Sequence, residues 1–213
     1  MSAPGTHDFA VVSTEDVHVG RVVALRVDEV RMPGGGVARR EVVEHLGAVA
    51  IAAVDDDERI TMIHQYRHPL RRRIWELPAG LLDQDGEAPV DSARRELVEE
   101  AGLTARQWET LVDVAASPGF TDEVVRVFLA RGVSEVERQH PGHDDEEADL
   151  VVHRVPLAEA VRMALAGELV NGATVAGVLA AHAVLTGAAK TRPVDAPWRD
   201  RPTTFAKRSP DRG

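Results

Sequence analysis

The hydrophobic pattern changes period several times along the chain. Residues 17–32 are rich in valine with charged residues interleaved, residues 33–36 read PGGG, and residues 37–44 resume the alternation. This pattern predicts an antiparallel hairpin. Residues 1–16 are polar, and we expect them to be loosely held apart from a candidate short strand at 9–12. A two-stranded unit of this size is marginally stable alone, so we expect it to need a partner surface, which favours a dimer.

The middle of the chain predicts a buried sheet. Residues 46–54, LGAVAIAAV, are almost wholly apolar, as expected for a strand that is buried on both faces. Three aspartates at 55–57 predict a turn, because the glycine and spacing of a calcium loop are missing. We expect further strands at 59–66, in the WELPAG segment at 75–80, at 108–116 and 124–130 around the turn SPGF, and at 151–155.

Three segments are predicted to be helical. Residues 157–169 and 173–185 have helical periodicity and are rich in alanine and leucine. The third helix begins near Pro89 and ends at Gly102, which can adopt the left-handed conformation of a helix stop. It carries an apolar stripe made of Val90, Ala93, Leu97 and Ala101. Strands interrupted by one central helix and closed by two more predict an α/β fold with a mixed sheet between helices.

The central helix also carries a concentrated acidic face. Glu96, Glu99 and Glu100 stand at i, i+3 and i+4, so their carboxylates share one side of the helix. Like charges at this spacing cost about 0.2–0.5 kcal/mol per pair. An isolated acidic run is usually a solvated helix face. A bound divalent cation with oxygen ligands would offset the repulsion.

The surrounding residues favour the metal interpretation. The chain reads Gly80, six residues, Glu87, seven residues, then Arg95-Glu96-Leu97-Val98-Glu99-Glu100-Ala101-Gly102-Leu103. This pattern resembles the signature of the Nudix hydrolases, in which five residues separate the glycine from the first glutamate. The loop here is one residue longer, and the helical register from Glu87 onward is unchanged. The resemblance implies an α/β/α sandwich over residues 46–190.

The resemblance also implies a metal site. Glu96 and Glu100 would be primary ligands of Mg²⁺, with Mn²⁺ as a substitute, and Glu99 would be a further ligand or support the others. The main-chain carbonyl of Ala79 would complete the set, and Arg95 would orient the cluster by pairing with Glu87 or Glu99. Such a cation suits diphosphate hydrolysis because it neutralises anionic oxygens and acidifies a water molecule.

Four further segments resemble the ADP-ribose pyrophosphatase subgroup: ARREVVEH at 38–45, HQYRHP at 64–69, WELPAG at 75–80 and ASPGFTDE at 116–123. In that subgroup the N-terminal strands are swapped across a homodimer. The implied activity is hydrolysis of ADP-ribose, a nucleoside diphosphate sugar, to AMP and ribose 5-phosphate by metal-activated water. The implied substrate-binding residues are Arg40 and Glu41, which reach the partner's substrate, Arg67 at the diphosphate, and Glu76, Gly119 and Glu123. Each charged residue among them could instead be a surface ion pair.

A general base is expected on the acidic loop at 132–149. The segment HDDEEADLVVHRV resembles the loop that carries the base in several relatives, which places Glu146 in this role with Glu147 as the alternative. Ala148 stands where some relatives have a metal-binding glutamate. His140 and His143 lie in the same loop without a third ligand at zinc-like spacing, so we expect them to be solvated.

Two alternative functions remain open. The signature does not name the group attached to the diphosphate, so the substrate could be another nucleoside diphosphate sugar or a dinucleotide. A non-catalytic Nudix-like module that senses a nucleotide is a different class. The intact set of glutamates argues against the sensor, because a pure binder gains little from clustered negative charge.

Composition narrows the partners and the compartment. A net charge of −10 and a pI near 5.4 argue against binding to nucleic acid or a membrane surface. The chain contains no cysteine, so it has no disulfide or thiolate metal site. It shows neither a signal peptide nor an 18-residue apolar run, and we expect a soluble, cytoplasmic protein. The expected domains are an N-terminal β domain at 1–45, the hydrolase domain at 46–190 and a flexible tail at 191–213.

Overall fold

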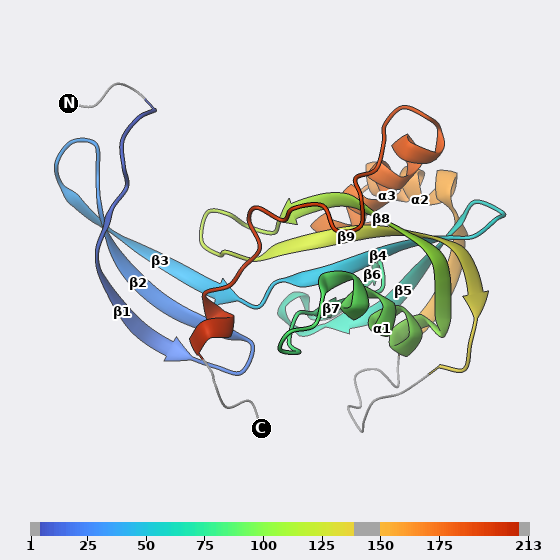
Figure 1. Ribbon diagram of the computed structural model, residues 1–213, viewed down its shortest axis with the longest axis horizontal. Coiled ribbons are helices and arrows are strands. Elements are labelled where there is room, and N and C mark those ends of the chain that lie inside the picture. Colours follow the sequence, from blue (N-terminus) through green and yellow to red (C-terminus); the bar gives the residue numbers. More distant parts are fainter. Residues whose placement is uncertain (1–4, 139–149, 209–213) are drawn as a thin grey trace. The chain divides into compact units, whose positions relative to one another are not determined.

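The structure, a computed structural model, describes residues 5–138 and 150–208 (Figure 1). The described chain forms two compact units. The first contains residues 5–47, 115–123 and 200–208, and the second contains residues 48–114, 124–138 and 150–199. Among the described helices, none is long and apolar enough to span a lipid bilayer.

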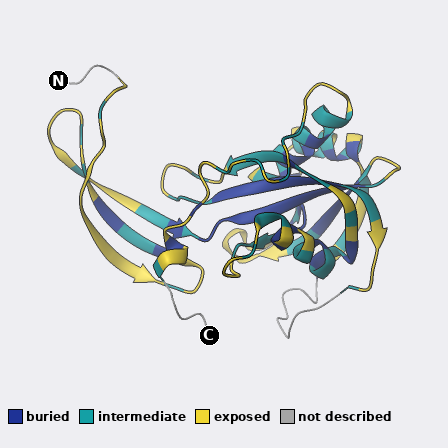
Figure 2. Cartoon of the chain, viewed as in Figure 1, coloured by how far each residue is buried: buried dark blue, intermediate teal, exposed yellow. Residues whose placement is uncertain are grey.

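The first unit is built on three antiparallel strands. These are β1 (Val11–Val19), β2 (Val23–Arg31) and β3 (Val37–His45), in the order β1-β2-β3. The hairpin expected around PGGG is therefore confirmed as β2–β3. The expectation that residues 1–16 are loosely held apart from a short strand at 9–12 was wrong at residues 13–16, because β1 runs from Val11 to Val19 and pairs with β2. All nine residues of β1 are exposed, and the strand is largely yellow in Figure 2. Because β1 has no buried face, its sequence carries no alternation of apolar and polar positions that would predict a strand.

Two distant segments complete the first unit. The turn that follows Ser117 is bonded to β3, because the Val43 amide donates to the Phe120 carbonyl at 2.7 Å and the His45 amide donates to Asp122 Oδ1 at 2.8 Å. The short helix η3 (Phe205–Arg208) buries Phe205 and pairs Arg208 with the fully buried Glu44. The domain division at residues 45 and 190 stays a prediction, and it did not include these two segments in the N-terminal unit.

The second unit contains a seven-stranded mixed sheet. Its main path runs β10-β5-β4-β9-β8, with β6 paired to β5 and β7 paired to β4. The pairing of β4 with β9 is parallel, whereas β4 pairs antiparallel with β5 and β7. The strands are β4 (Ala48–Val54), β5 (Arg59–Arg67), β6 (Arg72–Glu76), β7 (Ala79–Leu81), β8 (Leu103–Ala115), β9 (Val124–Glu135) and β10 (Val151–Pro156); a one-turn helix η1 (His68–Leu70) joins β5 to β6.

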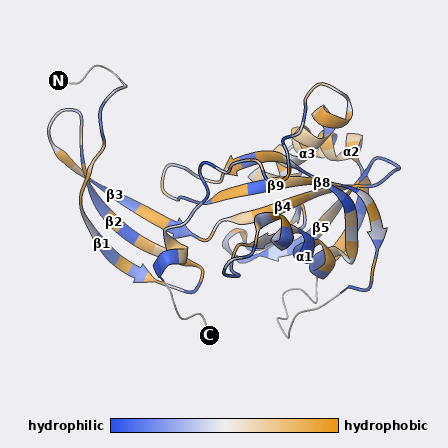
Figure 3. Ribbon diagram, in the orientation of Figure 1, coloured by the Kyte–Doolittle hydropathy of each residue, from blue (hydrophilic) through white to orange (hydrophobic). Residues whose placement is uncertain are grey.

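Helices cover both faces of this sheet, which confirms the expected α/β/α sandwich. Every residue of β4 is buried, and successive residues point to opposite faces. Val49, Ile51 and Ala53 pack with Ala93 and Leu97 of α1 (Pro89–Ala101). The alternate β4 residues pack with α2 (Leu157–Leu165) and α3 (Gly172–Leu185) on the other face (Figures 1 and 3).

The ends of α1 are those that the sequence predicted. Pro89 is the first helical residue, where its missing N–H costs little. Gly102 ends the helix with a φ of 62°, the left-handed conformation that glycine adopts without strain. The helix expected at 157–169 ends earlier, at Leu165, and Gly167 follows with a φ of 76°.

The segment after α3 is bonded to the sheet. Thr110 and Arg192 exchange two main-chain hydrogen bonds, of 3.0 and 2.9 Å. Arg126, only 3% exposed, donates to Asp113 at 2.7 Å and to the main-chain carbonyl of Ala196 at 2.7 Å. Burial alone would raise the pKa of Asp113, but Arg126 and Arg192 hold it below its usual value. The described residues 191–199 are thus tied to β8 and β9, whereas the sequence suggested a flexible tail.

We expect the substitution Arg126→Met to lower the free energy of unfolding by about 2 kcal/mol, because it removes one of the two arginines that pair with the half-buried Asp113 and leaves two main-chain carbonyls without this donor. Urea denaturation would measure the change. Arg162→Met is the matched control, since Arg162 pairs with Glu159 and Glu168 on an exposed face of α2. Equal losses in both variants would contradict the prediction.

Candidate active site

The site begins where two neighbouring strands separate. β4 pairs with β5 at Val54 and Ile60, and with β7 at residues 48–50. The chain between β6 and β7 passes from pairing with β5 to pairing with β4. Within this connection, the carbonyl of Pro78 accepts a hydrogen bond from the Ile51 amide at 2.8 Å. The WELPAG segment therefore lies within the sheet and places Ala79 and Gly80 beside α1. The rigid core strand β4 fixes this position.

Gly80 allows a close approach between β7 and the Glu96 side chain. A Cβ atom built on Gly80 would overlap the carboxyl end of the Glu96 side chain. Glu96 thus lies directly against the main chain of β7, and any larger residue at position 80 would displace it. This packing is the physical reason for a glycine at the start of the signature.

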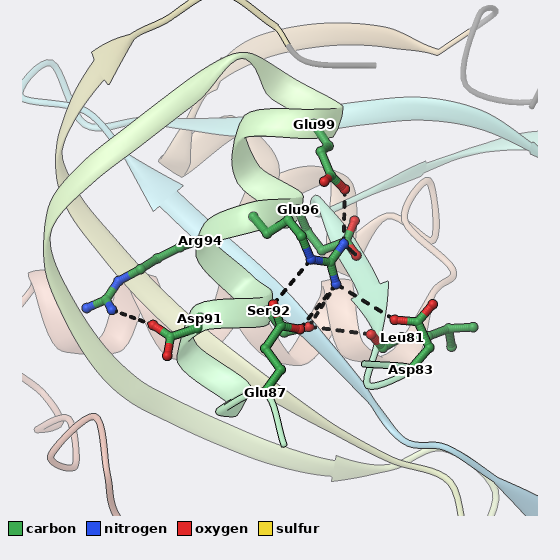
Figure 4. Close-up of polar contacts among 9 residues, drawn as sticks. Leu81, Asp83, Glu87, Asp91, Ser92, Arg94, Glu96 and Glu99 are labelled. Carbon is green, nitrogen blue, oxygen red and sulfur yellow. Dashed lines mark hydrogen bonds and ion pairs between the residues drawn. The ribbon is translucent and has the colours of Figure 1, made fainter. Parts of the chain in front are cut away.

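Arg95 joins Glu87, Glu96 and Glu99, which are labelled in Figure 4, into one cluster. Its Nη1 donates to Glu96 at 2.7 Å and to Glu99 at 3.0 Å, while Nε and Nη2 each lie 3.3 Å from an oxygen of Glu87. The sequence suggested Glu87 or Glu99 as the partner, and the structure shows both. The Glu96 and Glu99 side chains are each 12% exposed, so water screens this cluster only weakly.

The electrostatics of the cluster follow from this burial. Burial of the Glu96 carboxyl raises its pKa to about 7; Arg95 opposes the rise, and Glu99 and Asp83 add to it. Burial disfavours the charged form of Arg95 too, but Glu87, Glu96 and Glu99 together raise its pKa above the usual value. One guanidinium therefore neutralises only part of the negative charge around it.

Glu100 connects α1 to the WELPAG segment. It is 7% exposed, and its Oε2 accepts a hydrogen bond from the Ala79 amide at 2.8 Å. Over residues 5–138 and 150–208, no three acidic, histidine or cysteine side chains form a ready metal cage. The donor set nevertheless fits a hard divalent cation in its chemistry, because mostly buried carboxylates with incomplete neutralisation gather here.

Glu76 holds a second cluster together. It is 2% exposed, and its Oε2 accepts hydrogen bonds from Arg67 Nε at 2.8 Å and Gln65 at 2.7 Å. Its Oε1 accepts from Asn171 at 2.6 Å. Both carboxylate oxygens of Glu76 are thus engaged by the protein, whereas the Arg67 side chain remains 45% exposed. This geometry makes Glu76 an orienting partner of Arg67, and its expected contact with the substrate stays a prediction.

Sequence reasoning missed Gln65 and Asn171. Asn171 could have been recognised as the N-cap of α3, because asparagine is a favoured N-cap residue. In the structure its side chain accepts a hydrogen bond from the Thr174 amide at 2.9 Å. Its bond to Glu76 spans 95 positions, and no local pattern reveals such a contact.

The remaining substrate candidates belong to the first unit. Arg40 and Glu41 are exposed neighbours on β3, so their side chains leave opposite faces of the strand. Gly119 is exposed in the turn, and Glu123 is half-buried with Oε1 3.9 Å from His45 Nδ1. That nitrogen also accepts a hydrogen bond from the Gly47 amide at 3.0 Å.

The candidates on the acidic loop lie outside the described residues. These are the expected bases Glu146 and Glu147 and the histidines His140 and His143, all within residues 139–149. Their roles stay predictions.

Comparison with known proteins identifies the family. A family model described as the NUDIX domain matches residues 43–174. The ADP-ribose pyrophosphatase of Mycobacterium tuberculosis is 57% identical over 206 residues, which cover 97% of this chain and 99% of the relative. The methanol dehydrogenase activator of Bacillus methanolicus is 44% identical over 140 residues, covering 66% of this chain and 75% of the relative.

A solved structure shares the fold. It is described as an ADP compounds hydrolase, and it superposes with a TM-score of 0.75 over 87% of this chain and 98% of the other, at 19% identity. This likeness confirms the architecture, and the sequence matches show the family. The glutamates around Arg95, the glycine against Glu96 and the matched domain together show that the chain belongs to the Nudix hydrolases.

Proposed function

We propose that this protein hydrolyses the diphosphate of ADP-ribose to AMP and ribose 5-phosphate. One observation carries the proposal: the buried carboxylates of α1 stand against the WELPAG segment in a chain that is 57% identical, over nearly its full length, to a relative named ADP-ribose pyrophosphatase. In this reaction a water oxygen adds to one phosphorus, the bridging P–O bond breaks, and a base takes the proton of the water.

The proposed cofactor is Mg²⁺, with Mn²⁺ as a substitute. Glu96, Glu99, Glu100 and the carbonyl of Ala79 would hold it. When bound, the cation supplies neutralisation of the diphosphate oxygens and lowers the pKa of a water molecule. The raised pKa of Glu96 supports the proposal, because burial disfavours its charged form, and such a carboxylate gains most from a nearby positive charge. Arg95 would keep the carboxylates in place by its bonds to Glu96 and Glu99.

Arg67 is the proposed diphosphate ligand. Glu76 fixes its Nε, and the exposed part of the guanidinium can then form bidentate hydrogen bonds with phosphate oxygens. Arg40, Glu41, Gly119 and Glu123 are proposed to contact the rest of the substrate, and Glu146 or Glu147 to act as the base.

We also propose a cytoplasmic homodimer. The exposed valines of the three-stranded sheet support the dimer, since β1 alone exposes at least half of Val11, Val12, Val17 and Val19. Sedimentation velocity would test the dimer, and a monomer at micromolar concentration would rule the dimer out.

A substrate panel tests the proposed activity. We expect AMP release from ADP-ribose with Mg²⁺ or Mn²⁺, and loss of that activity when the metal is chelated. ADP-glucose, NADH and diadenosine polyphosphates, assayed in the same way, test the alternative substrates. If one of these compounds is hydrolysed faster than ADP-ribose, that compound is the preferred substrate. If the protein binds ADP-ribose but releases no AMP, a nucleotide sensor is favoured.

The variant Glu100→Gln separates the metal role from the structural role. The amide oxygen of glutamine can still accept the Ala79 hydrogen bond, but the negative charge is lost. We expect the rate of AMP release to fall by at least about 100-fold at fixed Mg²⁺, with thermal unfolding little changed. Wild-type activity in this variant would remove Glu100 from the metal ligands.

The variants Glu146→Gln and Glu147→Gln test the base. We expect Glu146→Gln to lower kcat by about 100-fold or more with little effect on KM, because general bases contribute to the chemical step. If Glu147→Gln alone has this effect, the base is Glu147. Full activity in both variants would exclude both residues.

A further inference from the structure

The C-terminal end of α1 is held by the chain that follows β9. The Val136 amide donates to the carbonyl of Gly102 at 2.9 Å, and Arg138 Nε donates to the carbonyl of Glu99 at 2.8 Å. The contact is close, because a Cβ on Gly102 would lie 3.2 Å from the Val136 carbonyl oxygen and 3.4 Å from Arg138 Cβ. A segment 39 positions along the chain thus caps the last turn of this helix.

A groove of about 510 Å³ lies beside this contact. The end of α1, the end of β9 and the edge strand β10 line it, and its two arginines differ in environment. Arg154 pairs at 2.8 Å with Glu135, whose side chain is 78% exposed. Arg138 instead turns towards the helix, and its Nη2 is buried without a hydrogen-bond partner among the described residues.

The last turn of a helix needs such a partner. Its final carbonyls have no intrahelical donor, and the helix dipole places partial negative charge there. The Gly102 amide bonds to Leu97 and Val98 carbonyls, and Arg138 satisfies the carbonyl of Glu99, which comes next. The partly buried guanidinium of Arg138 also opposes the negative charge of the dipole more strongly than a fully exposed one would.

The same turn carries two members of the acidic cluster. Glu99 directs its carboxylate to Arg95 and its carbonyl to Arg138, so these two arginines fix the residue from opposite ends. Glu100 follows directly and bonds to the Ala79 amide. Fraying of this turn would therefore move both carboxylates relative to β7.

We propose that Arg138 is a positioning residue for the metal-binding carboxylates Glu99 and Glu100, acting through the carbonyl of Glu99. This inference rests on the proposed function for the identity of the bound ion. Arg138 keeps the last turn of α1 in one place before the metal binds, so less ordering is needed on binding. It stabilises the arrangement of the ligands without touching the reacting atoms.

Substitution of Arg138 should weaken metal binding by about ten-fold, the size typical of residues that support metal ligands. The Mg²⁺ concentration for half-maximal AMP release should rise by the same factor, and kcat at saturating Mg²⁺ should change little. If Arg138 had a purely structural role, its substitution would instead lower the unfolding temperature, and it would not raise the Mg²⁺ concentration for half-maximal AMP release while leaving kcat unchanged.

The experiment compares Arg138→Met and Arg138→Gln with the control Arg154→Met, which removes the exposed arginine of the same groove. Mn²⁺ binding is measured by the electron paramagnetic resonance signal of the free ion, with no substrate present. We expect about ten-fold weaker binding in both Arg138 variants and wild-type binding in the control. Circular dichroism establishes which variants are folded. In each variant the hydrogen bond from the Val136 amide to the Gly102 carbonyl can still hold the segment after β9 against the end of α1.

Wild-type Mn²⁺ affinity in any folded Arg138 variant would overturn the proposal, and so would an equal loss in Arg154→Met. The proposed function can fail independently. A wild-type protein that binds Mn²⁺ but does not cleave ADP-ribose would refute that activity, while weaker Mn²⁺ binding by the Arg138 variants would still support the positioning role.

Discussion

A guanidinium shared by three carboxylates determines how the candidate site is built. Arg95 contacts Glu87, Glu96 and Glu99. The three carboxylates together carry more negative charge than one arginine can neutralise. In water such repulsion would be small, but these side chains are mostly buried, and the pKa of Glu96 rises to about 7. The rest of the site serves to hold like charges close together and to leave them incompletely neutralised, which is the condition that favours a cation.

The sheet provides the rigid side of this arrangement. Because β4 changes its pairing from β5 to β7, the main chain of β7 lies beside α1, and at Gly80 it is in direct contact with the Glu96 side chain. Glu100 bonds to Ala79, and Glu96 occupies the space that a Cβ on Gly80 would fill. The helix is therefore located by its apolar stripe on one side and by its acidic side chains on the other. Loss of either contact would move the carboxylates.

Buried charges elsewhere in the chain have a different purpose. In the first unit Glu44 is fully buried, with Arg26 and Arg208 as partners. In the second unit Arg126 donates to Asp113 and to two main-chain carbonyls, and Arg192 also pairs with Asp113. Both sets join segments that are distant in sequence, and the arginines are satisfied mainly by carboxylates and carbonyls. Such pairs hold C-terminal segments against the strands, in contrast to the cluster around Arg95, which retains unbalanced negative charge.

The sequence by itself determined the elements and the chemistry of α1, because both depend on local spacing. The strand at 46–54 was predicted from its continuous apolar run, and the stop at Gly102 from the left-handed conformation that glycine adopts. The acidic face at Glu96, Glu99 and Glu100 follows from the helical period of 3.6 residues. Only the tertiary structure decided the exposed strand β1, the bonds of Glu76 to Gln65 and Asn171, and the contact of Arg138 with Glu99. An edge strand without a buried face leaves no periodic signal, and a hydrogen bond across 39 or 95 positions depends on how the whole chain folds rather than on its neighbours in sequence.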